Sequence, residues 1–294
     1  MFLEQLINGL TLGSIYAIVA LGYTLVFGVL GIINMAHGEI FMFGAFMGVV
    51  ITYTLELPLV LAFAVAIVIT GILGLFLEWL ALRPLRGKKG VSHLAPLIST
   101  IGVSIFLENL AHHLFGAGNH PFRTSFSELS FQIGSVTVYA VQLVIFIIAI
   151  ILMVGLSFWL SKTKAGKALR ACAEDLDAAS LLGVNTKKMI TMTVIIASAM
   201  GGIAGVLVGM AFNSVTPQMG LSMGLKGLAI IILGGMGSIR GAMFGGLILG
   251  LSETMIVVFG ESGYRDAIAF VAIIIILLVR PQGLFGQAEP EARR

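Results

Sequence analysis

Long apolar runs dominate this sequence and set the strongest limit on its fold. Stretches such as 59–77 and 141–156 contain no charged residue. About 20 apolar residues are enough for a helix to cross the hydrocarbon core of a bilayer, whereas strands of a membrane barrel alternate apolar and polar residues. The chain is 58% hydrophobic and 11% charged, against roughly 25% charged residues in soluble domains. The sequence therefore predicts an all-α, polytopic integral membrane protein.

Dividing the chain by this length predicts eight or nine transmembrane or half-membrane helices. Segments 34–54 and 223–238 are interrupted by polar residues or glycine, which favours half-helices or re-entrant elements at these two places. Glycines four residues apart, as in Gly246 and Gly250, predict close crossings between helices. The predicted spans are 6–30, 34–54, 58–80, 94–116, 136–160, 188–212, 223–238, 241–260 and 264–280.

The basic residues predict which loops share one side of the membrane. Of the 17 Lys and Arg residues, 13 lie in three short segments: 83–89, 162–188 and the C-terminal stretch from Arg280. Basic loops are retained in the cytoplasm, so these segments are expected inside and the loop 117–135 outside. With nine crossings the N-terminus is outside, and with eight it is inside.

Several classes of chemistry find no support in the residues. Cys172 is the single cysteine, and no Cys/His spacing resembles a metal site. The basic residues are confined to short loops, so a pI of about 9.1 does not indicate a nucleic-acid partner. No H-E-x-x-H motif occurs, and His112 and His113 are adjacent rather than on one helix face. We expect no enzyme activity, no metal and no nucleic acid, and the N-terminus does not resemble a cleavable signal peptide.

The polar segment 161–187 is the longest interruption between predicted spans. Residues 165–182 read as one helix that ends at Gly183, a residue suited to the left-handed C′ position. Its apolar and small residues recur every three or four positions, which is typical of a mildly amphipathic helix. Two interpretations stay open: a helix lying on the membrane surface, or a docking helix whose small, flat surface fits a partner.

Five stretches together resemble one family of membrane proteins. Asp177-Ala178-Ala179-Ser180-Leu181-Leu182-Gly183 resembles the E-A-A-x-x-x-G coupling loop of permease subunits in bacterial ABC importers, with Asp in place of Glu at the first position. The segment before it, 166–175, is similar to the permeases of the branched-chain amino acid (Liv-type) importers. So are 33–39, 233–239 and 245–250. The resemblance covers essentially the whole chain and points to the shorter of that system's two permeases.

The resemblance implies a single transmembrane permease domain over 1–294 with a cytoplasmic coupling loop at about 161–187. Such a subunit moves leucine, isoleucine and valine across the bacterial inner membrane by alternating access, surrounded by membrane lipid. The implied partners are a second permease subunit, two cytoplasmic ATPase subunits and a periplasmic substrate-binding protein. ATP and Mg²⁺ would bind the ATPase subunits. The implied coupling residues are Glu174, Asp177, Ala178, Ala179 and Gly183.

The sequence agrees that the ATPase lies elsewhere, since no phosphate-binding G-x-x-x-x-G-K-[ST] motif occurs around Gly166-Lys167. Permeases for urea, short amides or other amino acids are closely similar and stay open as alternatives. An ion-coupled secondary transporter is a further alternative, although such a protein needs no long docking loop.

Ionisable residues inside predicted spans are candidates for a substrate pathway, because each costs roughly 2.5–3.5 kcal/mol at the centre of a membrane helix. Asn34, His37 and Glu39 follow the first span. They either offer polar groups to a zwitterionic substrate at a helix break or belong to a solvated loop on the cytoplasmic side.

Three further ionisable residues carry two interpretations each. Glu108 pairs either with a substrate ammonium near the outer mouth or with a histidine nearby. Lys226 either meets a substrate carboxylate or extends outward to the membrane surface. Glu253 either forms a structural hydrogen bond between packed helices or contacts the substrate. Arg265 and Asp266 are expected to form an interfacial pair.

Overall fold

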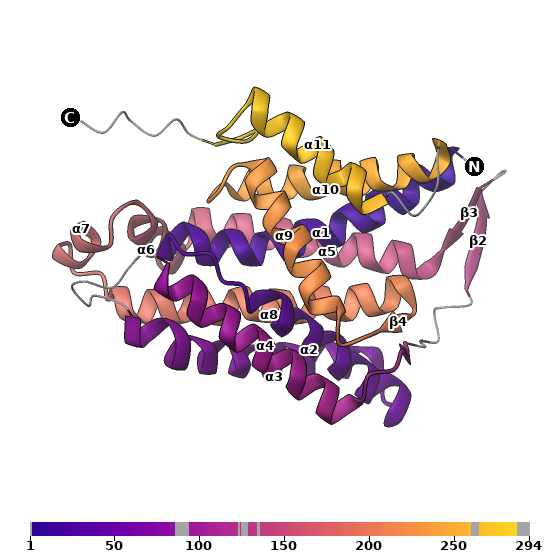
Figure 1. Cartoon of the computed structure of the whole chain (residues 1–294), viewed down its shortest axis with the longest axis horizontal. Helices are drawn as coiled ribbons and strands as arrows, with labels where there is room; N and C mark the ends of the chain where they lie inside the picture. The colour runs from indigo at the N-terminus through magenta and orange to yellow at the C-terminus, as the bar shows by residue number, and fades with distance from the viewer. Residues whose placement is uncertain are drawn as a thin grey trace.

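The computed structural model describes residues 2–85, 94–122, 124, 129–133, 136–259 and 265–286. Within these residues 11 α-helices carry nearly all of the regular structure, as the apolar runs predict (Figure 1). The long helices are α1 (Phe2–Leu30), α3 (Leu59–Leu77), α4 (Ala95–Phe115), α5 (Ala140–Lys162), α8 (Thr186–Phe212), α10 (Ile239–Phe259) and α11 (Arg265–Val279). The shorter ones are α2 (His37–Val49), α6 (Lys164–Glu174), α7 (Leu176–Leu181) and α9 (Met219–Gly234).

Irregular helical turns and short strands complete the described structure. A π-helical turn, Val50–Thr54, extends α2, and Glu78–Leu82 with the 3₁₀ turn Arg83–Leu85 extends α3. Strand β1 (His120–Pro121) pairs with β4 (Ser214–Val215), and β2 (Ser130–Ile133) pairs with β3 (Val136–Tyr139), both antiparallel.

Each predicted span coincides with one helix. The span 136–160 begins too early, because Val136–Tyr139 is a strand of the β2–β3 hairpin and α5 starts at Ala140. The span 223–238 ends too late, because Gly235 leaves the helix with a φ of +101°. Five helical segments of the described chain are long and apolar enough to cross a membrane: α1, α5, α8, Leu59–Leu85 and Ile239–Ile256. The protein is a multi-pass membrane protein.

The two ends of the helix bundle differ (Figure 1). We call the end with β2 and β3 the hairpin end and the opposite end, with α6 and α7, the α7 end. Helix α1 runs from the hairpin end, where Gln5 lies near Tyr139, to the α7 end, where Leu30 lies near Asp175. The described basic segments gather at the α7 end, since Arg83 shares a hollow with Lys187 and Lys188. The predicted basic residues Arg86, Lys88, Lys89, Arg293 and Arg294 lie outside the described residues.

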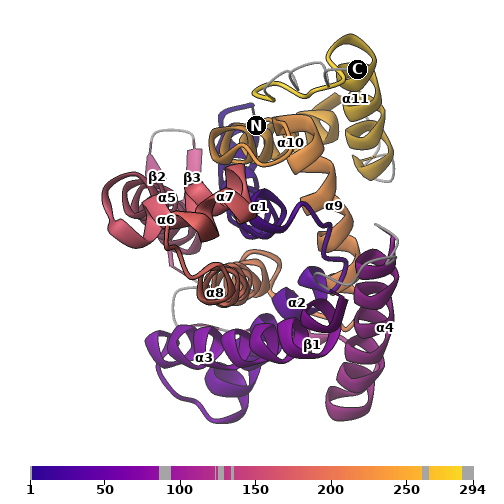
Figure 2. The same cartoon turned by 90° about the vertical axis from the view of Figure 1, so that its left-hand side faces the viewer.

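Helix α1 forms the centre of the bundle, with α5, α8, α9 and α10 around it (Figure 2). The predicted close crossing at Gly246 and Gly250 is confirmed. A Cβ atom on Gly250 would overlap the backbone of Gly13 in α1, and one on Gly246 would overlap Ala17. Small residues therefore let α1 and α10 approach backbone to backbone, as is typical where packing rather than hydrophobicity holds membrane helices together.

Helix α2 begins inside the bundle rather than at its surface. After α1 ends, residues 31–36 turn back, and the His37 ring lies against Gly22 of α1. Gly22 is eight residues before the end of α1, which corresponds to a depth of about 12 Å at 1.5 Å per residue. Gly38 packs against Gly220 of α9. The alternative of a solvated loop is wrong, since Asn34, His37 and Glu39 are all buried, whereas a half-helix or re-entrant element stays a prediction.

The segment 161–187 contains two helices where the sequence predicts one. Asp175 is extended, with a φ of −159°, and its Oδ1 accepts hydrogen bonds from the N–H groups of Asp177 at 2.8 Å and Ala178 at 2.9 Å. Such an N-cap starts a new helix, α7. Gly183 ends α7 as predicted: its φ is +84°, and the N–H groups of Gly183 and Val184 bond to the last carbonyls of the helix.

Candidate functional site

The first turn of α2 carries a buried polar centre. Asn34 shapes the turn before the helix, because its Oδ1 accepts a hydrogen bond from the N–H of Ala36 at 3.1 Å. His37 then packs edge-on against the Tyr23 ring of α1, with ring centroids 4.6 Å apart. Neither ring nitrogen of His37 has a hydrogen-bond partner in the part of the chain that the structure describes. Buried polar atoms usually have partners, so this imidazole is an exception that points to function.

Glu39 joins three helices at this centre. Its Oε1 accepts a hydrogen bond from Ser104 of α4 at 3.1 Å. Its Oε2 lies against Gly220 of α9, where any Cβ atom would collide with the carboxylate. Among the described residues, Oε2 has no hydrogen-bond partner. We call Tyr23, His37, Glu39 and Ser104 the α2 polar centre.

A polar stripe on α4 leads from this centre to the hairpin end. Ser104, Glu108 and His112 are four residues apart and so lie on one face of the helix. Glu108 is half-buried and close enough to Glu39 for an electrostatic interaction. His112 meets Gln218, next to the start of α9, with 3.3 Å between the two Nε2 atoms. Within the described chain, the partner of His112 is thus Gln218 and not Glu108.

Lys226 and Glu253 form a buried ion pair. Lys226 Nζ lies 3.0 Å from Glu253 Oε1, and the two side chains are 11% and 0% exposed. The Tyr16 hydroxyl of α1 donates to Glu253 Oε2 at 2.8 Å and accepts from Lys226 at 2.9 Å. The side chain of Lys226 therefore points into the bundle, contrary to the outward extension weighed from the sequence. The triad links α1, α9 and α10.

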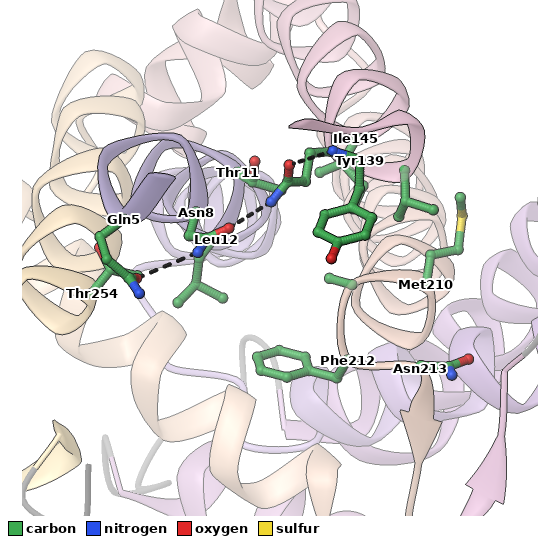
Figure 3. Close-up of a pocket in the computed structure, with 13 residues that line it drawn as sticks. Gln5, Asn8, Thr11, Leu12, Tyr139, Ile145, Met210, Phe212, Asn213 and Thr254 are labelled. Atoms are coloured by element: carbon green, nitrogen blue, oxygen red, sulfur yellow. Dashed lines mark hydrogen bonds between the residues drawn. The ribbon is translucent and has the colours of Figure 1, made fainter. Parts of the chain in front are cut away.

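A cavity of about 390 Å³ opens near the hairpin end between α1, α5, α8 and α10 (Figure 3). We call it the amide pocket, because Gln5, Asn8, Gln142 and Asn213 line it. Gln142 donates to Asn8 at 2.5 Å, and Asn8 donates to Gln5 at 3.4 Å. No charged side chain is among its described lining residues, so the pocket offers uncharged donors and acceptors.

At the α7 end, α7 presents an exposed apolar tip. Leu181 is 90% exposed and Leu182 is 83% exposed. Asp177 and Ala178 are exposed beside them. Ala179, in contrast, is 2% exposed and belongs to the core, so it is not available on the surface of the implied coupling loop.

A hollow of about 650 Å³ separates the end of α1 from α6 and α7. Exposed Glu174 and Asp177 line it, together with Cys172. Burial raises the pKa of the Cys172 thiol. The side chains of Arg265 and Asp266, expected to pair, lie outside the described side chains.

Sequence reasoning missed the hydroxyl-bearing residues that contact His37, Glu39 and Glu253. Tyr16, Tyr23 and Ser104 lie within long apolar helices and contribute no charge to the pattern. Tyr16 meets Glu253 across 237 residues of sequence. A rule based on spacing detects neighbours on one helix, and no such rule connects these positions.

Known proteins are similar to this chain over nearly its whole length. The family model described as the permease component of branched-chain amino acid transport systems matches residues 5–278. The high-affinity branched-chain amino acid transport permease BraD of Pseudomonas aeruginosa is 40% identical over 99% of this chain and 97% of its own. LivH of Escherichia coli is likewise 40% identical, with the same coverage. The ribose import permease RbsC of Haemophilus influenzae is 24% identical over 94% of this chain and 84% of its own. No solved structure matches significantly.

Proposed function

Because the chain belongs to the family of permease components of branched-chain amino acid transport systems, we propose that it is the membrane permease of an ATP-driven importer for leucine, isoleucine and valine. The observation that carries this proposal is the 40% identity to two such permeases along nearly the entire chain. The ribose permease, at 24%, is much less similar, which favours amino acids over sugars as the transported class.

We further propose that the chain works in the bacterial inner membrane beside a second permease subunit, with two cytoplasmic ATPase subunits and a periplasmic substrate-binding protein. The exposed tip of α7 supports a partner at the α7 end, since Leu181 and Leu182 bury little of their surface within this chain. The basic residues at the same end support its cytoplasmic location. ATP and Mg²⁺ belong to the ATPase subunits in this arrangement.

The α2 polar centre and the α4 stripe form the proposed substrate pathway. The N–H groups at the start of a half-helix favour a carboxylate, and Glu39 and Glu108 suit an ammonium group. A zwitterionic amino acid needs both kinds of partner. Gly38 packs directly on Gly220 of α9 beside this centre. Alternating access requires that this contact opens in another state.

The α7 tip is tested by the double substitution Leu181→Asp/Leu182→Asp. We expect ATP-dependent leucine uptake to fall about tenfold or more while the amount of assembled permease is unchanged, because both side chains are exposed in the chain itself. The measurement is uptake of labelled leucine into cells, together with ATPase activity stimulated by the binding protein. Leu181→Met/Leu182→Met keeps the apolar surface and is the matched control.

Normal uptake in the Asp variant would show that α7 does not dock an ATPase.

Depletion of the cell's energy sources tests the proposed transport function itself. Leucine uptake is expected to stop when ATP is depleted and to continue when the proton gradient is dissipated. The opposite result would identify an ion-coupled transporter and overturn the proposed function.

The pathway is tested by Glu39→Gln, which keeps an acceptor for Ser104. If Glu39 contacts the substrate ammonium, the KM for leucine uptake rises about tenfold, because a charge-assisted hydrogen bond contributes roughly 1.5–3 kcal/mol. Glu253→Gln is the control for loss of a buried carboxylate, since Glu253 is engaged by Lys226: the amount of assembled permease is expected to fall, but the KM of the permease that assembles is expected to stay unchanged. An unchanged KM in Glu39→Gln would remove Glu39 from the pathway.

A further inference from the structure

A basic hollow lies at the α7 end between the end of α3 and the start of α8. Its volume is about 760 Å³. Arg83 enters from the 3₁₀ turn after α3, and Lys187 and Lys188 enter from the first turn of α8. Glu78 lines the same hollow, but it is buried and engaged in an interaction of its own. The remaining lining residues are Asn185, Thr191, Met192 and Ile195.

The start of α8 adds to the positive character of this hollow. A helix N-terminus presents free N–H groups and the positive end of the helix dipole. The side-chain oxygen of Asn185 accepts a hydrogen bond from the N–H of Lys188 at 3.0 Å. The N–H groups of Thr186 and Lys187, which precede Lys188 in the first turn, have no intrahelical partner. Three cations against one carboxylate leave the hollow with an excess of positive charge that an anion can neutralise.

The lining of the hollow changes from basic to apolar along α8, where Met192 and Ile195 follow the two lysines. On α3 and the π-helical turn that extends it, a stripe of exposed residues recurs at spacings of three and four and so forms one face: Val68, Ile72, Leu75 and Trp79. From Val68 to Trp79 there are 11 steps of 1.5 Å, which cover about 16 Å, roughly the depth of one leaflet. Trp79, 59% exposed, ends the stripe and directly follows Glu78, which lines the basic hollow; tryptophan is enriched at membrane interfaces.

We propose that the basic hollow and the α3 stripe together form a groove that binds an anionic phospholipid of the cytoplasmic leaflet. Its phosphate lies between Arg83, Lys187 and Lys188, and an acyl chain lies along the α3 stripe. Basic pockets between helices on the cytoplasmic side suit such headgroups. A second copy of this chain is a poorer occupant, because it would bring another set of cations to the same place. The proposal is independent of which substrate is transported.

The test uses the complete importer, solubilised with its partner subunits and placed in bilayers of phosphatidylcholine with a minor share of phosphatidylglycerol. The phosphatidylglycerol that remains with the complex after transfer to a neutral detergent is measured by native mass spectrometry. Arg83→Gln/Lys187→Gln/Lys188→Gln is expected to reduce this retained lipid about tenfold, while phosphatidylcholine retention stays the same. Lys162→Gln/Lys164→Gln/Lys167→Gln removes the same charge at the same end and is expected to retain the lipid.

Two further arms make the result decisive. An excess of inorganic phosphate is expected not to displace the lipid; displacement would indicate a site for free phosphate. Trp79→Gln/Ile72→Gln is expected to lower retention, because it removes the apolar part of the groove. Equal retention in the wild type and the Arg83/Lys187/Lys188 variant would overturn the proposal, as would an equal loss in the control. A cross-link from position 188 to another subunit would show that protein covers the hollow.

Discussion

Lys226→Met is expected to destabilise the folded chain by about 3–5 kcal/mol, because it removes the ammonium group that neutralises the buried Glu253 carboxylate. Glu253 is completely buried, so water cannot replace the lost ammonium group. The measurement is the midpoint of thermal unfolding in detergent, together with the amount of permease in the membrane. Glu253→Leu removes the carboxylate alone and leaves the Lys226 ammonium group without it, so a similar loss of stability is expected.

The double variant Lys226→Met/Glu253→Leu separates a structural pair from a substrate contact. Replacing both partners of a buried ion pair by apolar residues is often close to neutral. We therefore expect the double variant to recover most of the stability that each single variant loses. If the two losses simply add, the residues do not depend on each other. If stability recovers but leucine uptake does not, the pair has a role in transport besides packing.

Gly250→Val is expected to prevent normal assembly, because even a Cβ atom at this position overlaps the backbone of Gly13. Flexible side chains can move aside, but two helix backbones in contact cannot, so α10 would have to leave α1. Overpacking usually costs about 1–3 kcal/mol, and backbone overlap lies at the upper end of that range or above it. The measurement is the fraction of solubilised permease that runs as a single species in gel filtration.

Gly155→Val is the matched control for this substitution. Gly155 is also in the middle of a long helix, α5, but a Cβ atom there meets nothing within 4 Å. Because valine has a higher helix propensity than glycine, this variant is expected to be neutral or slightly more stable. Normal assembly of Gly250→Val would mean that α1 and α10 are not packed as described.

The fold was largely predictable because the membrane fixes the length of its helices. A run such as 141–156 has no alternative to a buried or spanning helix, so each predicted span has a counterpart in the structure. The break at Asp175 was not predicted, because the residues on both sides favour a helix and only the side-chain cap separates them. Strand β3 was missed for a similar reason, since the two valines of Val136–Tyr139 extend the apolar run of α5 toward the N-terminus.

The candidate site was predictable only as a set of residues. The cost of polar groups in a membrane singled out Glu39, Lys226 and Glu253. Their partners depend on which helices meet, and the sequence contains no direct measure of that. The depth of His37 likewise follows from the backward turn of residues 31–36, which places it beside Tyr23.

The glycine contacts of α2 have a mechanical consequence. Gly38 lies on Gly220 of α9, and Gly44 lies on Gly202 of α8, so this half-helix touches two neighbours backbone to backbone. Interlocked side chains must change rotamer before two helices can shift, whereas smooth backbone surfaces slide past one another without that barrier. At these two contacts, therefore, no side chain has to change rotamer before α2 can shift against α8 or α9.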